Sequence, residues 1–385
     1  MNSEAWIQAE LDTLEKKHLK RCLKVYPQAG GRLIIDGKPF LNFSSNDYLD
    51  LAHRPEVTQR AQDALRQFGA GAGASRLVSG SMPLHEELET RVAEHKGYDA
   101  ALVFGSGFLT NLGAIPALAG RSDTVFADKL VHASIIDAIL LSRANLIRFR
   151  HNDDEHLAAQ LKKNAGAGRR LIVTESVFSM DGDLAPLPEI AALAEEHSAM
   201  LMVDEAHATG VFGPHGAGLI REHGMERNVN ISMGTFSKAL GNYGGFAACS
   251  VPMKEWLSNR ARSFIYTTAL PPSVLGGCLG ALDVLNKEPD IGNELQCRAE
   301  YFRGLLKERG FDTGQSASQI IPIMIGDSER AIELAARLRK RGIIAVAIRP
   351  PTVPKGTARL RLSVTLAHTK QDLTQTAEVL AEMFE

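Results

Sequence analysis

The feature that most constrains the fold of this chain is a regular alternation of short apolar runs with helix-like stretches between residues 100 and 235. The runs have the length and composition of buried strands, and they lie at 101–104, 124–127, 146–149, 171–174, 201–204 and 231–234. Parallel strands need crossover connections, so the alternation predicts an α/β fold whose mostly parallel sheet is covered by helices on both faces. Ligands bind beyond the carboxyl ends of such strands, so the residues after each run are the candidates for a functional site.

The segments outside this alternation predict smaller parts. Residues 3–25 have the apolar spacing of one amphipathic helix, and a hairpin is expected at 31–43 around the Asp36-Gly37 turn. Further helices are expected at 55–68, 83–96, 329–341 and the C-terminus, and further strands at 320–325, 343–348 and 358–364. We therefore expect an N-terminal segment at 1–50, a large domain at 51–284 and a small α+β domain at 285–385.

Composition excludes several classes of function. The chain has 43 basic and 45 acidic residues, so it offers no field that would attract nucleic acid or an anionic membrane. Its four cysteines include no C-x-x-C pair, and its N-terminus lacks the pattern of a signal peptide, which together predict a cytoplasmic protein. The uncharged stretch 100–120 contains four glycines and Pro116, so we expect a strand, a glycine loop and a buried helix there instead of a membrane span.

The strongest chemical signal comes from the segments 201–210 and 231–245. The first apolar run ends at Asp204, with His207 three residues later, and the second leads directly into Lys238, with glycines at 241, 244 and 245. In isolation these residues would be a helix cap, a structural histidine and a surface lysine. A D-x-x-H unit can also bind metal, but no further cluster with ligand spacing supports a metal site. Small residues around Lys238 indicate close approach to a ligand, where loss of solvation leaves a neutral amine able to form an imine.

The motifs V-D-E-A-H (203–207) and T-F-S-K-A-L-G (235–241) resemble those of the fold-type I pyridoxal-phosphate enzymes and, within them, the α-oxoamine synthases. The similarity covers roughly residues 20 to 370. Members of this family join an amino acid to an acyl thioester with loss of carbon dioxide. The resemblance implies that Lys238 holds pyridoxal 5′-phosphate and that Asp204 pairs with the pyridine nitrogen, which keeps the ring an electron sink. It also implies a hydrogen bond from His207 to the phenolic oxygen of the ring.

Other segments match the family's cofactor site. The strand, glycine loop and helix at 103–111 would bind the phosphate through a helix N-terminus. The resemblance assigns backbone contacts there to Gly107 and Phe108, and a hydroxyl contact to Thr235. The motif D-x-x-x-H-A-S (128–134) places His132 on the cofactor ring, as a catalytic residue that also meets the substrate, and the segment 174–183 places Ser179 beside the cofactor.

The resemblance also implies substrate and subunit contacts. Arg361 corresponds to the arginine that clamps the amino-acid carboxylate, a task that suits a guanidinium. Thr352, Arg21 and Asn46 correspond to residues around the acyl substrate. The segment 264–272, with Thr267 and Thr268, resembles the part that reaches the cofactor phosphate of a second subunit, which implies a homodimer; a helix end followed by prolines explains the same residues locally. Asp50 stands where the family commonly has glycine, so the resemblance leaves the form of that turn open but not the chemistry.

The choice of substrates rests on two segments. Residues 71–81 and 348–362 most resemble the members that join L-alanine to a pimeloyl thioester in biotin synthesis. Members that use glycine with acetyl or succinyl thioesters usually carry Tyr-Pro where this chain has Pro350-Pro351. An aminotransferase or Cβ-lyase on the same fold, and a non-catalytic relative, are alternatives. The sequence leaves open whether coenzyme A or an acyl-carrier protein carries the acyl group.

Overall fold

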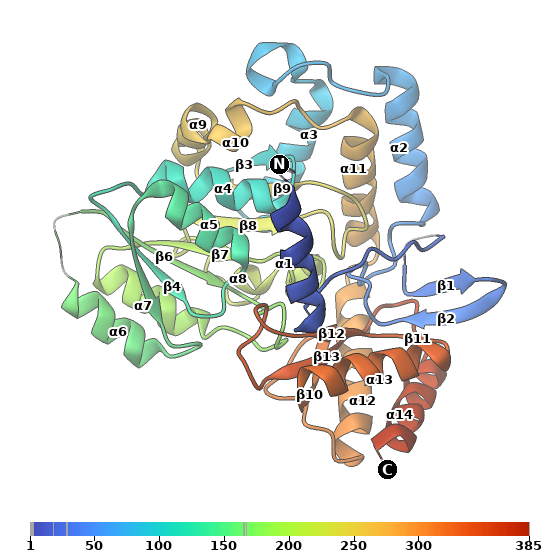
Figure 1. Cartoon of the computed structure of the whole chain (residues 1–385). Helices are drawn as coiled ribbons and strands as arrows, with labels where there is room; N and C mark the ends of the chain where they lie inside the picture. The colour runs from blue at the N-terminus through green and yellow to red at the C-terminus, as the bar shows by residue number, and fades with distance from the viewer. Residues whose placement is uncertain (1–3, 18, 28–29, 165, 167, 385) are drawn as a thin grey trace. The chain divides into compact units, whose positions relative to one another are not determined.

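The computed structural model describes residues 4–17, 19–27, 30–164, 166 and 168–384 (Figure 1). The chain forms two compact units. The larger, called here the large unit, comprises Asn46–Ser179 and Asp183–Gln296; the small unit comprises Met1–Ser45, Met180–Gly182 and Cys297–Glu385. The domain boundaries expected after residues 50 and 284 stay a prediction.

A seven-stranded sheet in the order β3-β9-β8-β7-β6-β4-β5 forms the core of the large unit. All six predicted runs are strands of this sheet: β3 (Ala100–Phe104), β4 (Thr124–Asp128), β5 (Asn145–Phe149), β6 (Arg170–Glu175), β7 (Met200–Asp204) and β8 (Ile231–Thr235). The neighbours from β8 to β5 pair in parallel, while β9 (Gly245–Cys249) runs antiparallel between β8 and β3. The strands β3, β8 and β9 are buried along their whole length, as expected when helices cover both faces. The predicted α/β class is confirmed.

Helices fill the connections of the large unit. They are α2 (Pro55–Phe68), α3 (Pro83–Lys96), α4 (Gly107–Leu118), α5 (Ala133–Ser142), α6 (Asp154–Lys163), α7 (Leu187–Glu196), α8 (Leu219–Glu222), α9 (Val251–Arg260), α10 (Arg262–Ile265) and α11 (Pro272–Lys287). The uncharged stretch 100–120 is β3, a glycine loop and α4, as predicted. No helix in the described ranges is long and apolar enough to cross a membrane.

The small unit contains two three-stranded sheets. The predicted hairpin, β1 (Arg32–Ile35) and β2 (Lys38–Asn42), is joined by β11 (Ile343–Ile344), and the second sheet has the order β10-β13-β12. The remaining elements are β10 (Ile320–Gly326), β12 (Val346–Ile348), β13 (Ala358–Ser363), α13 (Ser328–Lys340) and α14 (Lys370–Phe384), and α12 (Ile291–Glu308) begins in the large unit and ends in the small one. The expectation of one strand at 343–348 is wrong, because this run divides between the two sheets.

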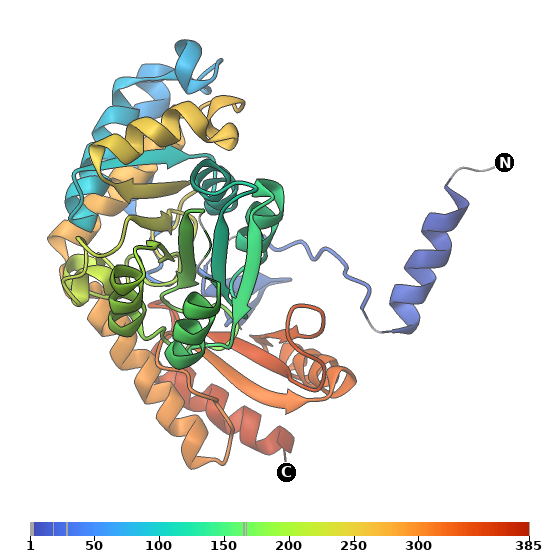
Figure 2. The ribbon, with the colours of Figure 1, turned by 90° about the vertical axis from the view of Figure 1, so that its left-hand side faces the viewer.

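The N-terminal helix is also shorter than predicted. α1 spans Ala5–Lys16, and residues 19–26 have no regular secondary structure (Figure 2). If the helix continued, lysines four residues apart would lie next to each other on its surface, Lys16 beside Lys20 and Lys20 beside Lys24. Such pairs of equal charge destabilise a helix. Ser3 and His18, which the prediction included, lie outside the described residues.

Candidate functional site

The carboxyl ends of four neighbouring strands bring polar side chains to one edge of the large sheet. β8, β7, β6 and β4 end in Thr235, Asp204, Glu175 and Asp128, all of them buried. Glu175 and Asp204 are direct partners in the β6–β7 register. This edge is the place where a site was expected from the order of the elements.

Lys238 and His207 lie together beside this edge. The Lys238 Nζ is 2.9 Å from His207 Nε2, and the other ring nitrogen, Nδ1, is 2.7 Å from the Tyr48 hydroxyl. The Tyr48 hydroxyl in turn donates to Asn46 Oδ1 at 3.1 Å. Three of the predicted residues, Lys238, His207 and Asn46, are therefore joined through one tyrosine that the sequence argument had not singled out.

A second network joins Asp204 to His132. Asp204 Oδ1 accepts the backbone N–H of Ala206 at 2.9 Å, and its Oδ2 accepts from Asn111 Nδ2 at 3.0 Å. Asn111 also contacts Ser134 Oγ at 2.9 Å, and that hydroxyl lies 2.8 Å from His132 Nδ1. The carboxylate is thus held in one orientation, and the same contacts fix the imidazole.

Glu175 holds the backbone of His132. Its Oε1 accepts the His132 N–H at 2.5 Å. Burial, together with the charge on Asp204, raises the pKa of Glu175 well above its usual range. Burial also lowers the pKa of His132, and the charge on Lys238 acts in the same direction. Both effects favour a neutral imidazole at His132.

The N-terminus of α4 lies beside the end of β8. Ser106 caps the helix by accepting the Leu109 N–H at 3.2 Å. A methyl group on Gly107 would come within 3.0 Å of the Met233 side chain and 3.4 Å of Thr235 Cβ, and one on Gly245 would lie 2.6 Å from the Gly107 nitrogen. Only glycines permit this approach. The first N–H groups of a helix have no partner within it, so the backbone N–H groups at Gly107 and Phe108, beside Thr235, are donors suited to an anion.

The other predicted residues lie elsewhere. In the large unit, Ser179 follows β6 and is partly exposed, and the exposed Thr268 forms an isolated bridge with Ser75, next to Thr267. In the small unit, Arg21 Nη2 lies 3.5 Å from Thr352 Oγ1, so these two predicted acyl contacts are adjacent. Arg361 is buried in β13 and donates to Ser363 Oγ at 2.8 Å.

A family model described as aminotransferase class I and II matches residues 38–380. The chain belongs to the class I and II aminotransferase family.

Relatives within this family are similar over nearly the whole chain. The 8-amino-7-oxononanoate synthase of Geobacter sulfurreducens is 46% identical over 380 residues, which is 98% of this chain and 97% of that protein. Among solved structures, a serine palmitoyltransferase from S. paucimobilis with a bound PLP–myriocin aldimine has a TM-score of 0.92 at 32% identity, covering 98% of this chain and 96% of that one. The 8-amino-7-oxononanoate synthase of Francisella tularensis has a TM-score of 0.78 at 30% identity, with 90% and 98% covered. The resemblance drawn from the motifs is confirmed.

The structure of this family member also reveals a cluster that the sequence did not predict. His151 Nδ1 lies 3.0 Å from Asp128 Oδ1, and its Nε2 lies 2.7 Å from Asp183 Oδ2. Burial alone would lower the pKa of His151, but the hydrogen bonds to Asp128 and Asp183, with their charges, raise it to about 10. The imidazolium therefore ties the segment that leads to His132 to the segment that follows Ser179. His151 comes two residues after the end of β5, so the strand-end rule could have found it.

Proposed function

We propose that this chain is an 8-amino-7-oxononanoate synthase. It condenses L-alanine with a pimeloyl thioester and releases 8-amino-7-oxononanoate, carbon dioxide and the free thiol, a step of biotin biosynthesis. The observation that carries this proposal is the identity of 46% over 98% of the chain with a synthase of that name. The alternative is another α-oxoamine synthase, above all a glycine C-acetyltransferase, which would share the fold and the cofactor.

The residues at the edge of the large sheet fit pyridoxal 5′-phosphate. Asp204 is buried and held by two donors, which suits a partner for a protonated ring nitrogen, and Lys238 lies at hydrogen-bond distance from His207. Gly107, Phe108 and Thr235 would hold the phosphate, and His132 would stack on the ring with Ser179 beside it. A related structure carries PLP, which supports the same cofactor here.

Each residue of the site has a task in the proposed reaction. When bound, the cofactor supplies an electron sink for negative charge at Cα of alanine. Asp204 would keep the proton on the ring nitrogen, and His207, oriented by Tyr48, would hold the phenolic oxygen. Lys238 would bind the cofactor and then move the proton at Cα. In the small unit, Arg361 would take the carboxylate of alanine.

The assembly is proposed to be a homodimer in the cytoplasm. Thr267 and Thr268 would reach the cofactor phosphate of the second subunit. Near them, Val78 is 81% and Tyr266 72% exposed, an unusual exposure for large apolar side chains and one that a subunit interface would cover.

A substrate panel tests the proposed function. Thiol release is measured with alanine or glycine against pimeloyl-, acetyl- and succinyl-coenzyme A, each as kcat/KM. We expect pimeloyl with alanine to be preferred, with weak activity for glycine, because one methyl group contributes only about 1–3 kcal/mol of discrimination. A preference for glycine with acetyl-coenzyme A would instead identify a glycine C-acetyltransferase. Keto-acid exchange without thiol release would indicate an aminotransferase.

The position of the cofactor is tested separately. Borohydride reduction of the yellow holoenzyme should fix the label on one peptide, the one that contains Lys238. A label recovered on another lysine would contradict the assignment, and a purified protein that binds no cofactor would favour a non-catalytic relative.

A further inference from the structure

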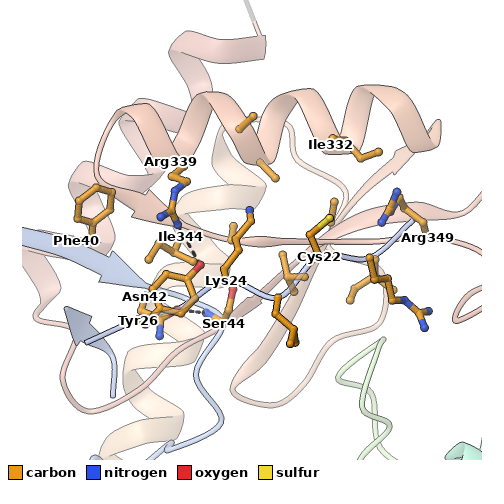
Figure 3. A pocket seen from close by; sticks show the side chains of 18 of the residues that line it. Cys22, Lys24, Tyr26, Phe40, Asn42, Ser44, Ile332, Arg339, Ile344 and Arg349 are labelled. Atoms are coloured by element: carbon orange, nitrogen blue, oxygen red, sulfur yellow. Dashed lines mark hydrogen bonds between the residues drawn. The ribbon is translucent and has the colours of Figure 1, made fainter. Parts of the chain in front are cut away.

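A buried ion pair adjoins the candidate site and has no task in the chemistry described above. Lys96, the last residue of α3, contacts Glu205, and their side chains are 1% and 0% exposed. Among the lysines that the structure describes, Lys96 alone is fully buried. By comparison, the cations Lys24, Arg339 and Arg349, which line a cavity of the small unit, are exposed or half-buried (Figure 3). Lysine is almost never fully buried unless it is paired, because its charge loses its hydration.

The Glu205 carboxylate joins three elements of the large unit to the end of β7. Its Oε1 accepts the backbone N–H of Ile220 in α8 at 3.0 Å. Its Oε2 accepts from the Ser232 hydroxyl in β8 at 3.0 Å and from the Lys96 amine of α3. That amine also donates to the Thr209 hydroxyl at 3.4 Å. The four side chains of this network are at most 2% exposed, so water does not compete for these contacts and they hold the carboxylate in one orientation.

The backbone of Glu205 connects this network to the two residues proposed to hold the cofactor ring. Asp204 precedes Glu205, and His207 follows it by two positions. The Glu205 N–H donates to the Met233 carbonyl of β8 at 2.7 Å, and the Glu205 carbonyl accepts the Thr209 N–H at 2.8 Å. Glu205 therefore continues the pairing of β7 with β8 by one residue and begins the turn that carries His207. A shift of its side chain would move both neighbours.

Two further observations indicate that the network fixes a position. A methyl group on Gly218 would lie 2.5 Å from Glu205 Oε2, so the chain that follows the turn is packed directly against the carboxylate. Stability alone is a weak reason for such a pair, because the lost hydration of two charges cancels much of their attraction and an apolar pair of similar volume is often as stable. A carboxylate with three donors differs from an apolar side chain in that its direction is defined.

We propose that Lys96 and Glu205 are positioning residues for the cofactor, which act through Asp204 and His207. Their ion pair holds the backbone at 204–207 so that the carboxylate and the imidazole reach the ring nitrogen and the phenolic oxygen together. The inference rests on the proposed placement of the cofactor ring between Asp204 and His207. It does not depend on which amino acid or acyl group the enzyme uses.

The test separates position from stability in the full-length protein. Lys96→Met removes the cation and leaves the Glu205 carboxylate buried without a counter-charge. We expect the Kd for pyridoxal phosphate, measured by visible absorbance on protein that circular dichroism shows to be folded, to rise about tenfold, as when a group that orients a metal ligand is removed. With saturating cofactor, kcat should fall about tenfold while the KM for alanine changes less than about twofold, because Arg361 is unchanged.

A second variant should restore the site. Lys96→Met combined with Glu205→Gln removes both charges and keeps an oxygen that can accept the Ile220 N–H, so its Kd should lie within about threefold of the wild-type value. Arg91→Met is the matched control, a loss of a cation on the same helix, where Arg91 pairs with Asp283 at 2.9 Å and is 24% exposed. It should leave the Kd unchanged.

Three results would overturn the inference. The first is a folded but less stable Lys96→Met protein with an unchanged Kd, which would assign the ion pair to stability alone. The second is an equal rise in Kd for Arg91→Met, and the third is a double variant that binds the cofactor no better than Lys96→Met does. If Lys96→Met does not fold, Ser232→Ala, which removes one donor from Glu205, takes its place: its Kd should rise about threefold, and an unchanged value contradicts the proposal. The Kd needs no acyl substrate, so a failure of the proposed reaction in the substrate panel is a separate result.

Discussion

The His151 cluster allows a prediction that links stability to the organisation of the site. His151→Gln keeps hydrogen-bonding groups near Asp128 and Asp183 but removes the positive charge between them. The two aspartates would then face each other without compensation, and Asp128 is fully buried. We therefore expect the variant to be destabilised at neutral pH.

The size of the effect follows from the pKa. A shift from about 6.5 to about 10 corresponds to an upper limit of about 5 kcal/mol, at 1.36 kcal/mol per unit. The His151 side chain is 24% exposed, so solvent screens part of this interaction. We expect a loss of about 2–3 kcal/mol in the free energy of unfolding, near the lower end of the range for a broken buried pair.

The pH dependence has a definite sign. The pKa of His151 is higher in the folded state than in the unfolded state, so its contribution is complete below about pH 6.5 and is lost as the pH rises towards about 10. Denaturant unfolding of wild type and His151→Gln between pH 6 and pH 10 should therefore give curves that converge at high pH. His223→Gln, a change at an exposed histidine, is the control. A difference that is small at pH 6.5, or that is constant with pH, would refute the role of the imidazolium.

The same variant should also bind the cofactor less tightly. Asp128 begins the segment that leads to His132, and Asp183 ends the segment that contains Ser179, so loss of the His151 contacts should loosen both residues. Excess pyridoxal phosphate should then restore part of the absorbance of the variant.

Three further predictions concern the site itself. Asp204→Asn should retain the cofactor but lower kcat by about 10²-fold or more, because the ring nitrogen loses its proton; a near-normal kcat would show that this role is misplaced. Glu175→Gln should keep kcat/KM within about threefold at pH 7, because the raised pKa of Glu175 favours the neutral carboxyl and an amide has the same shape; a loss of more than about tenfold would show an ionised carboxylate there. Mixing Lys238→Ala subunits with subunits changed at Thr267 and Thr268, each inactive alone, should restore activity in hybrid dimers; full activity of the threonine variant would contradict the shared site.

The sequence predicted most of the large sheet because its strands are buried on both faces and so consist of continuous apolar runs. β9 was missed because four of the five residues of Gly245–Cys249, all but Phe246, are small and lack the bulk typical of a strand, and its partners are set by the register with β3 and β8. The N-terminal helix was overextended because its apolar spacing continues past Lys16, while the repulsion of its lysines stops it. The apolar periodicity therefore predicted which residues are buried, but it did not predict where repulsion between like charges ends a helix.

The predicted site residues and the missed ones also differ in this way: local apolar patterns indicate the first group, whereas contacts between distant residues determine the second. Asp204 and Thr235 end apolar runs, so their position in a parallel sheet could be predicted from the chain alone. The raised pKa of Glu175 depends on burial and on its pairing with Asp204 across two strands, and the raised pKa of His151 depends on aspartates that lie 23 and 32 residues away along the chain. No local pattern contains such information.

The turn at Asp50 shows how a departure in sequence can leave a site intact. Asp50 has a φ of 56°, the left-handed conformation for which glycine is the usual choice and which aspartate tolerates better than most residues. The preceding Asp47 accepts the backbone N–H groups of Leu51 at 2.9 Å and Ala52 at 3.2 Å, so the turn is held by a side chain as well as by the conformation of Asp50. Tyr48 lies between these two aspartates and is fully buried, with its hydroxyl on His207. The backbone at residue 50 thus keeps the form that glycine would adopt, and the contact that orients His207 is preserved without it.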